Sequence, residues 1–384
     1  MGSIDGPGSI REPLDSARPA NAGNRRPRLV GGTTDLADEP RRKTGIDDDH
    51  PDVGGSGTGD VQPPVLIEHL DAIVATAARA PSVHNTQPWR FRLSGNVLEL
   101  HADPSRRLDR VDPQGREMLI SCGAALFGLR LAVRKFGFRP VVELLPSRAR
   151  PDLLARIRLG AAVSIRTGEQ RLLDATRRRH THRGPFTAEE LPDGLPAALQ
   201  RDAESEAATL VLVRAGGDYR QLAALVAAAE QRQCHHPILA AEMRAWTHPR
   251  TSRPRDGVPA QAFPSSPARR RGSLAQRDFD LGRGWGTLSA AGYPPAMTAV
   301  LTTRGDSPAD WLRAGQALHR LLLHAASEWV FATLHTQPLE LPPFRAAIRT
   351  QLRLPGVPQM LLQLGRARVA PLTGRRPASE LLMP

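Results

Sequence analysis

The 384 residues are enough for two or three domains, and the chain carries a formal net charge of +13. Lys43 and Lys135 are the only lysines, so arginine carries nearly all of the positive charge. Aromatic residues make up only 4% of the chain, too few to interleave with basic residues as a stacking surface for bases, which argues against nucleic-acid binding as the main function.

The sequence has no feature of a membrane-spanning or secreted protein. No apolar run approaches the roughly 20 residues that cross a bilayer, and no apolar segment follows the early pair Arg25 and Arg26. Cys122 and Cys234 share no metal-binding or redox-active spacing. We therefore expect a cytoplasmic protein that does not bind membranes.

Residues 1–62 are rich in Gly, Pro, Asp, Arg and Ser and have no apolar periodicity. Such a composition cannot bury enough apolar surface to fold, so a disordered N-terminal extension is predicted. The next segment has apolar residues at spacings of three and four, which indicate one face of a helix: Leu66, Leu70, Ile73, Val74 and Ala77. Pro81 ends this helix.

A polar loop follows the helix and leads into a strand. Pro88 biases Gln87 towards an extended conformation, so the backbone groups of the loop are free to meet a ligand. The loop combines short polar side chains with stiff apolar ones, namely Pro81, Ser82, Asn85, Gln87, Pro88 and Trp89. This combination suits a flat heterocyclic ligand. The alternative is a polar surface loop anchored by a buried tryptophan.

The remainder of the first half predicts four strands and a long helix. The strands are expected at Trp89–Leu93, Val97–His101, Val141–Leu145 and Ile157–Leu159, the first two forming a hairpin. The apolar stripe of the helix runs from Met118 to Val133, and Gly137 is suited to its C′ position.

A basic stretch, Arg177–Phe186, separates the two halves. If it is extended, the side chains that share one face are Arg177, Arg179, Thr181 and Arg183. Guanidiniums on one face of a strand form a fork that matches a dianionic phosphate, with bidentate geometry that lysine lacks. A solvated basic edge strand is the alternative.

The segment from Glu230 to Ala290 is the least regular part of the chain. It contains His235, His236 and His248 near a helix predicted at Pro237–Trp246, but no acid or cysteine completes a ligand spacing, so no metal site is expected. Thr247–Gly286 is rich in Pro, Gly, Arg and Ser and includes the basic run Ala268–Gly272, which we expect to be solvated. A loop of this length is typical of a lid or of disorder.

A second long helix is predicted to begin at Ser307, where Pro308 and Asp310 complete a start that resembles a capping box. Its residues repeat those of the first long helix at a constant offset, with Gly123, Ala125, Leu126 and Leu129 aligned to Gly315, Ala317, Leu318 and Leu321. Each helix is followed by a short apolar strand that ends in Leu-Gly. This weak internal repeat indicates a pseudo-dimer within one chain.

Three motifs resemble those of one family. Residues 80–91, APSVHNTQPWRF, resemble the APSxxNxQPWxF loop of FMN-dependent nitroreductases, and the chain from about Val65 onward is similar to the Acg-like actinobacterial branch of that family. The basic stretch resembles the RRSxR-type opening motif, with Arg179, Thr181 and Arg183 at the matching positions. TGRRP, Thr373–Pro377, resembles the basic tail motif.

This resemblance implies an α+β, nitroreductase-like fold, internally duplicated as a pseudo-dimer in one chain. The expected parts are a disordered extension (1–62), a first half (63–167) and a second half (168–384) with a lid-like loop near 247–286. The loop motif occurs only in the first half and the basic motif only in the second, so one complete FMN site is expected. The chain would be a monomer or a weak homodimer.

The resemblance also implies the cofactor-binding residues: Pro81, Ser82, Asn85, Gln87, Arg179, Thr181, Arg183, Gln337, Arg375 and Arg376. Arg179 and Arg376, and with them Arg375, would hold the FMN phosphate, while Arg183 would lie near N1 and the C2 carbonyl of the ring. Flavin N5 would carry the chemistry, so no catalytic side chain is expected.

The implied function is hydride transfer from NAD(P)H through FMN to a small, electron-poor acceptor. One alternative is a flavin-sequestering protein whose lid covers the site, and another is an arginine-rich nucleic-acid-binding protein. The chain departs from the family at the end of the second long helix, where a small Gly-Leu step is usual. The backbone there often approaches flavin N5 in the family, so the bulky Trp329 of this chain is expected to alter the ring geometry and the turnover.

Overall fold

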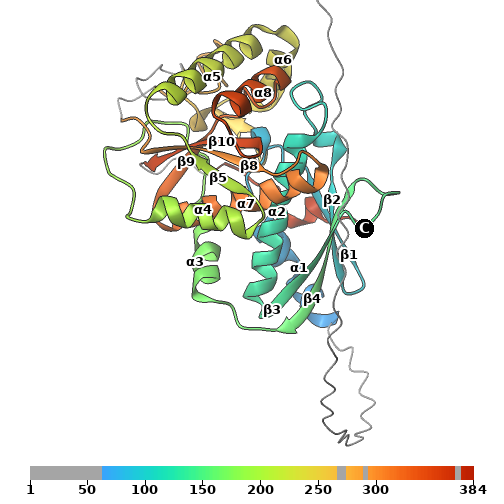
Figure 1. The fold of residues 1–384 in the computed structure, drawn as a ribbon. Helices are drawn as coiled ribbons and strands as arrows, with labels where there is room; N and C mark the ends of the chain where they lie inside the picture. Colours follow the sequence, from blue (N-terminus) through green and yellow to red (C-terminus); the bar gives the residue numbers. More distant parts are fainter. Residues whose placement is uncertain (1–62, 266–273, 289–292, 368–372) are drawn as a thin grey trace, which may run out of the picture. The chain divides into compact units, whose positions relative to one another are not determined.

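The computed structural model describes residues 63–265, 274–288, 293–367 and 373–384, which all belong to one compact unit, Gly59–Pro384. The extension 1–62 and the basic run Ala268–Gly272, for which disorder and solvation were expected, lie outside the described residues. The described part is a mixed α/β fold with two four-stranded antiparallel sheets and two long helices between them (Figure 1). None of its helices is long and apolar enough to span a membrane.

The first sheet has the strand order β1-β2-β4-β3. Its strands are β1 (Trp89–Ser94), β2 (Val97–Ala102), β3 (Phe138–Leu144) and β4 (Leu153–Ala162). All four predicted strands are present, and β1 and β2 form the expected hairpin. Trp89 and Phe91 are fully buried because their face of the sheet packs on α1 (Pro63–Ala77) and α2 (Arg116–Lys135).

The second sheet has the order β5-β8-β10-β9. Its strands are β5 (Thr209–Leu212), β8 (Met297–Thr303), β9 (Val330–Leu334) and β10 (Val357–Arg366). Because side chains alternate along a strand, Leu301 packs towards α4 (Leu195–Ser205) and α7 (Pro308–Ser327), whereas Val300 packs towards α5 (Gly217–His235) and α8 (Pro342–Gln351). Helices therefore cover both faces of this sheet.

The helices α2 and α7 lie side by side and cross where each has a glycine (Figure 1). A methyl group on Gly123 would overlap the backbone carbonyl of Leu312, and one on Gly315 would overlap the carbonyl of Ile120. The contact is reciprocal, since the same offset relates Gly123 to Gly315 and Ile120 to Leu312. Only glycine allows the two backbones to approach so closely.

The predicted termini of the long helices are confirmed. The Ser307 hydroxyl accepts a hydrogen bond from the Asp310 amide at 3.3 Å, and the Asp310 carboxylate accepts one from the Ser307 amide at 3.0 Å. At the other long helix, Gly137 follows the C-terminus of α2 with φ +84°. The N-terminus of α7 and the C-terminus of α2 thus carry groups that satisfy backbone polar atoms without a partner inside the helix.

The prediction of a strand at Arg177–Phe186 is wrong. After α3 (Thr167–Ala175) the amides of Arg178 and Arg179 donate back to the carbonyl of Ala175, which winds the chain into a turn. Only Thr181 pairs with a strand, through an isolated bridge to Ala332 in β9. Arg177 is exposed and Arg179 is buried, so the expected single face of guanidiniums does not form.

The described parts of the segment from Thr247 to Gly286 contain regular structure, where a loop was expected. The helix before it, α6 (Pro237–Ala245), leads into a parallel pair of short strands, β6 (Thr247–His248) and β7 (Val258–Pro259). A small apolar core supports the pair, formed by Met243, Val258, Ala260, Phe263 and Phe279. The remaining short helices are η1 (Val83–Asn85), η2 (Pro104–Arg106), η3 (Ala260–Ala262) and α9 (Ala378–Leu381).

Candidate functional site

The loop between α1 and β1 has an unusually tight backbone. His84, Asn85 and Gln87 all have positive φ, at 45°, 56° and 50°, a region that costs a residue with a side chain roughly 1–2 kcal/mol. Two hydrogen bonds hold this conformation: the Gln87 amide donates to the Ser82 hydroxyl at 3.0 Å, and the Val83 amide donates to the Ser121 hydroxyl at 3.2 Å. Strain of this kind persists where the surroundings fix it, often at binding sites.

Asn85 and Gln87 connect the loop to two segments that are distant in sequence. Asn85 Nδ2 donates to the carbonyls of Gly257 (2.9 Å) and Gly374 (3.2 Å). Gln87 Nε2 donates to the Arg255 carbonyl at 2.8 Å, and Gln87 Oε1 accepts from the Arg376 amide at 2.9 Å. Both side chains are buried, so their role in this structure is to join the loop, the segment before β7 and the C-terminal segment.

The other side of the loop faces a cavity of about 70 Å³, which we call the first cavity. At 10–15 Å³ for each water position, it has room for about five water molecules. Its polar lining comes from the loop, the start of α2, the basic stretch and β9, and includes Ser82, His84, Glu117, Ser121, Thr181, Arg183, Thr333 and Thr336.

Arg277 and Phe279, from the segment that precedes Gly286, cover the first cavity. The Phe279 ring meets His84 edge-on, with ring centroids 5.3 Å apart, and the Arg183 guanidinium lies 5.1 Å from the centre of the same ring. Burial and the nearby Arg277 lower the pKa of His84 to about 3, so this imidazole is neutral. The cover leaves too little space for a flat ligand of three fused rings unless Phe279 moves.

Four arginines, which we call the arginine cluster, gather next to the first cavity: Arg79, Arg179, Arg183 and Arg375. Arg179 Nη2 donates to the carbonyl of Arg79 at 3.0 Å, and Arg375 Nη2 donates to the carbonyl of Ala80 at 3.3 Å. Arg375 Nη1 also donates to Asn85 Oδ1 at 2.9 Å. Within the described residues, none of the four guanidiniums has a carboxylate partner.

Mutual repulsion and burial affect the protonation of these side chains. Burial, together with neighbouring arginines, lowers the pKa values of Arg179 and Arg183 to about 10 and depresses that of Arg375 well below its usual value. The buried Nε atoms of Arg179 and Arg375 have no hydrogen-bond acceptor among the described residues. Buried cations with unused donors form a ready site for an anion, and their planar forks match the oxygens of a phosphate.

Arg376 and Gln337, which were expected to join the cofactor site, have other partners. Arg376 lies 3.5 Å from Glu380 and 3.9 Å from Asp103, so its charge is balanced. Gln337 is buried, and its Nε2 donates to Glu230 Oε2 at 2.9 Å. Neither side chain lines the first cavity.

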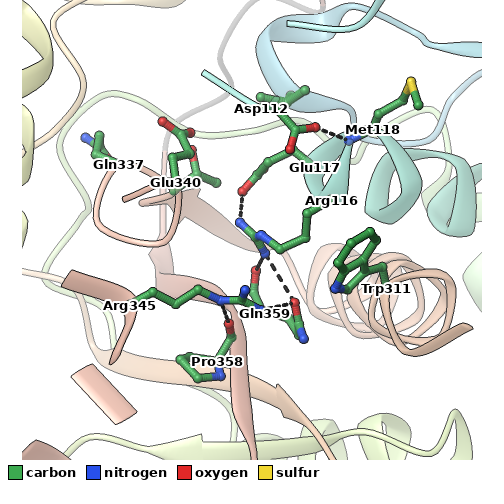
Figure 2. A network of polar contacts seen from close by, with 12 residues as sticks. Asp112, Arg116, Glu117, Met118, Trp311, Gln337, Glu340, Arg345, Pro358 and Gln359 are labelled. Carbon is green, nitrogen blue, oxygen red and sulfur yellow. Dashed lines mark hydrogen bonds and ion pairs between the residues drawn. The ribbon is translucent and has the colours of Figure 1, made fainter. Parts of the chain in front are cut away.

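A buried network of acids and arginines surrounds Glu117, which also lines the first cavity (Figure 2). Glu117 contacts Arg116, and Arg277 holds Glu340 with bonds of 2.7 and 2.8 Å. The network borders a second cavity of about 610 Å³, lined by Asp112, Arg116, Glu117, Glu340 and Arg345 among others. Glu117 lines both cavities.

Comparison with known proteins identifies the family. A Mycobacterium tuberculosis protein named "Putative NAD(P)H nitroreductase acg" is 30% identical to this chain over 323 residues, which cover 83% of this chain and 96% of that protein. The chain belongs to this nitroreductase family. A second M. tuberculosis protein, whose name also begins "Putative NAD(P)H nitroreductase", is 31% identical over 324 residues, which cover 82% of this chain and 91% of its own length.

A third M. tuberculosis relative, which has no functional name, is 30% identical over 323 residues, covering 82% of this chain and 92% of that protein. No model of a protein family matches the chain. Among solved structures, a nitroreductase from Anabaena variabilis covers 71% of this chain and 69% of its own, with a TM-score of 0.41 and 12% identity.

Within this nitroreductase, the residues expected at the cofactor fall into three groups. Those that line the first cavity are Pro81, Ser82, Thr181 and Arg183; those in the arginine cluster are Arg179, Arg183 and Arg375; those engaged elsewhere are Asn85, Gln87, Gln337 and Arg376. Trp329 is the residue at which the chain departs from the family and for which altered ring geometry was expected. Its side chain is 52% exposed, stacks on Arg178 at 4.4 Å, and does not line the cavity.

The sequence analysis missed several residues of the site. Arg79 belongs to the arginine cluster, and its position directly before the loop motif is the signal that could have identified it. Phe279 and Arg277 had no such signal, because the segment that carries them has no regular pattern. Glu117 was also missed, since an acid near a helix start is usually explained by the helix dipole alone.

Proposed function

We propose that the protein binds FMN and reduces small, electron-poor acceptors with NAD(P)H. Membership in the nitroreductase family makes it an oxidoreductase, and the arginine cluster carries the more specific proposal. Arg179 is a buried cation and Arg183 and Arg375 are half-buried ones, and none of the three has a carboxylate partner among the described residues; they lie at the edge of a cavity formed by the family's loop motif. A phosphate group on a flat cofactor supplies the missing negative charge.

In this proposal Arg79, Arg179 and Arg375 hold the phosphate, and the ring enters the first cavity beside Ser82 and Arg183 after Phe279 has shifted to make room. When bound, the flavin supplies the hydride-transfer chemistry that no protein side chain can perform. The residues of the chain bind the cofactor and orient its ring. Arg183 places a fixed positive charge beside the ring position, and the Phe279 side chain keeps bulk water away from it.

The site combines both halves of the chain, and we propose that these halves, 63–167 and 168–384, form a duplicated pseudo-dimer. The reciprocal packing of Gly123 and Gly315 supports this, because a contact in which each element repeats the other is what a two-fold axis produces. One chain then completes one site, as expected of a monomer or a weak homodimer.

The cover over the first cavity favours a second candidate function. Phe279 and Arg277 line the cavity that the ring would occupy, and a nicotinamide must come close to that ring, because hydride transfer needs the reacting atoms about 3–3.5 Å apart. A protein whose cover stays closed would hold flavin without turning it over.

Anaerobic mixing of the FMN-loaded protein with NADH or NADPH separates the two functions. Bleaching of the flavin within the mixing time supports the oxidoreductase. If dithionite reduces the flavin but neither nucleotide does, the protein holds flavin without turning it over. Phe279→Ala should then allow a nucleotide to reduce the flavin. Trp329→Ala is the matched control, since it removes an aromatic side chain that does not line the cavity. A protein that cannot be loaded with FMN contradicts both.

A further inference from the structure

Glu117 lies at the boundary between the two cavities. Its side chain is only 3% exposed, and it borders both the first cavity and the second cavity. On the side of the second cavity its nearest acids are Asp112, in the turn before α2, and Glu340, before α8 (Figure 2). Glu117 can therefore present a proton to the first cavity and take up a new proton from the second cavity.

The charges around Glu117 do not balance if every acid is ionised. The acids that face it are Asp112 and Glu340, and the facing cations are Arg116, Arg277 and Arg345. Two of these cations are already engaged: Arg277 makes a two-oxygen pair with Glu340, and Arg345 pairs with Asp306 at 2.7 Å. Arg116 alone is left for two carboxyl groups.

The remaining cation is itself shared. Arg116 donates to the carbonyl of Gln359 at 2.8 Å and to Gln359 Oε1 at 3.2 Å, besides its contact with Glu117 Oε1. That contact leaves Glu117 Oε2 free to carry a proton, because a neutral carboxyl still accepts through its other oxygen.

Protonation at neutral pH follows from the surroundings. Burial, with further contributions from the acids Glu340 and Asp112, raises the pKa of Glu117 to about 8 in spite of Arg116. Burial raises the pKa of Asp112 to about 6, whereas the pair with Arg277 keeps the pKa of Glu340 below its usual value. At neutral pH these shifts favour a proton on Glu117, while Asp112, with a pKa of about 6, is mostly ionised and able to accept and pass on a proton.

We propose that Glu117 donates a proton to the acceptor molecule reduced in the first cavity and is reprotonated through Asp112 from the second cavity. This inference rests on the proposed oxidoreductase function. It assigns a proton donor to the proposed reduction, in which the loop motif and the arginine cluster only bind the cofactor.

The chemistry balances for an acceptor with a nitro group. Reduction of nitro to nitroso uses two electrons and two protons and releases one water molecule. The nicotinamide nucleotide supplies both electrons together with one proton. Glu117 supplies the other proton: its O–H bond breaks, an O–H bond forms on the departing oxygen, and the carboxylate that remains takes a proton from solvent.

The first test uses the full chain without flavin. Infrared difference spectra recorded as the pH rises should show a protonated carboxyl band that disappears near pH 8, and Glu117→Gln should remove it. Asp112→Asn should shift this titration to lower pH, because it removes a neighbouring acid that raises the pKa of Glu117. The matched control is Glu169→Gln, an acid paired with Arg134 that lines neither of the two cavities. A spectrum that Glu117→Gln leaves unchanged overturns the inference.

The second test uses the FMN-loaded protein and a nitroaromatic acceptor. Glu117→Gln should retain flavin binding and reduction by NAD(P)H but slow acceptor reduction roughly 100-fold, the usual effect of losing a general acid, and abolish its decline above pH 8. An unchanged rate and an unchanged pH profile in Glu117→Gln would refute the role of Glu117 as proton donor and leave the proposed function standing. Failure of the unaltered protein to bind flavin, or to be reduced by a nucleotide, refutes the proposed function instead.

Discussion

Replacing Arg179 with methionine should change two measurable quantities in opposite directions. The guanidinium is buried, lies among other arginines, and has no carboxylate among the described residues. When no anion is bound, the positive charge of Arg179 destabilises the folded protein. When an anion is bound, the same charge increases the affinity for that anion. The flavin-free protein should therefore become more stable while the affinity for FMN falls.

The magnitudes follow from the lowered pKa. A tenfold change in proton affinity is worth roughly 1.4 kcal/mol, so a fall in pKa from 12.5 to about 10 corresponds to a cost on the order of 3 kcal/mol for Arg179. Arg179→Met also removes the hydrogen bond to the Arg79 carbonyl, worth about 1 kcal/mol. We expect a net gain of about 1–2 kcal/mol in the free energy of unfolding of the flavin-free protein.

Loss of affinity should be specific to the phosphate. A hydrogen bond to a charged group contributes about 1.5–3 kcal/mol, so the preference for FMN over riboflavin should fall roughly 10- to 100-fold. Urea unfolding without flavin and titration with both flavins measure the two effects. Arg376→Met is the control, because its charge is balanced by Asp103 and Glu380 and it should leave the preference unchanged. A less stable Arg179→Met variant with an unchanged preference would refute the reasoning.

Three further changes test the fold. Gly315→Ala should lower the free energy of unfolding by about 3 kcal/mol or more, since its methyl group would meet a backbone carbonyl of α2, whereas Gly168→Ala has open space and should change it by less than about 1 kcal/mol. Trp329→Gly should alter stability by no more than about 1 kcal/mol, because relief of the positive φ (58°) offsets the lost stacking on Arg178. Ser307→Ala should cost about 1 kcal/mol by removing the cap of α7. Urea unfolding measures all of these.

The regular elements could be predicted from the sequence because local patterns determine them. The hairpin of β1 and β2 follows from alternating residues, and the start of α7 follows from the positions of Ser307 and Asp310. The stretch Arg177–Phe186 could not be predicted, since alternation says nothing about whether a partner strand is present. Among the described residues, its one bridge to a strand pairs Thr181 with Ala332, and the other strand residues that it contacts, Phe331 and Gly365, also lie far along the chain.

The site was harder to predict than the fold. Arg375 and Arg376 are adjacent, yet one belongs to the arginine cluster and the other pairs with Glu380. A pattern of residue types cannot distinguish them, because a single step along an extended backbone reverses the direction of a side chain. Glu117 and Glu340 come together only through tertiary packing, and each alone is typical of a solvated acid.

The links made by Asn85 also bear on how the protein acquires its cofactor. Asn85 accepts from Arg375 and donates to the carbonyl of Gly374, so a segment near the end of the described chain completes a site that begins at Arg79. A growing chain on the ribosome lacks Arg375 until almost all of the fold has been synthesised. If the site binds an anionic cofactor as proposed, its arginine cluster is complete only after Arg375 has been synthesised.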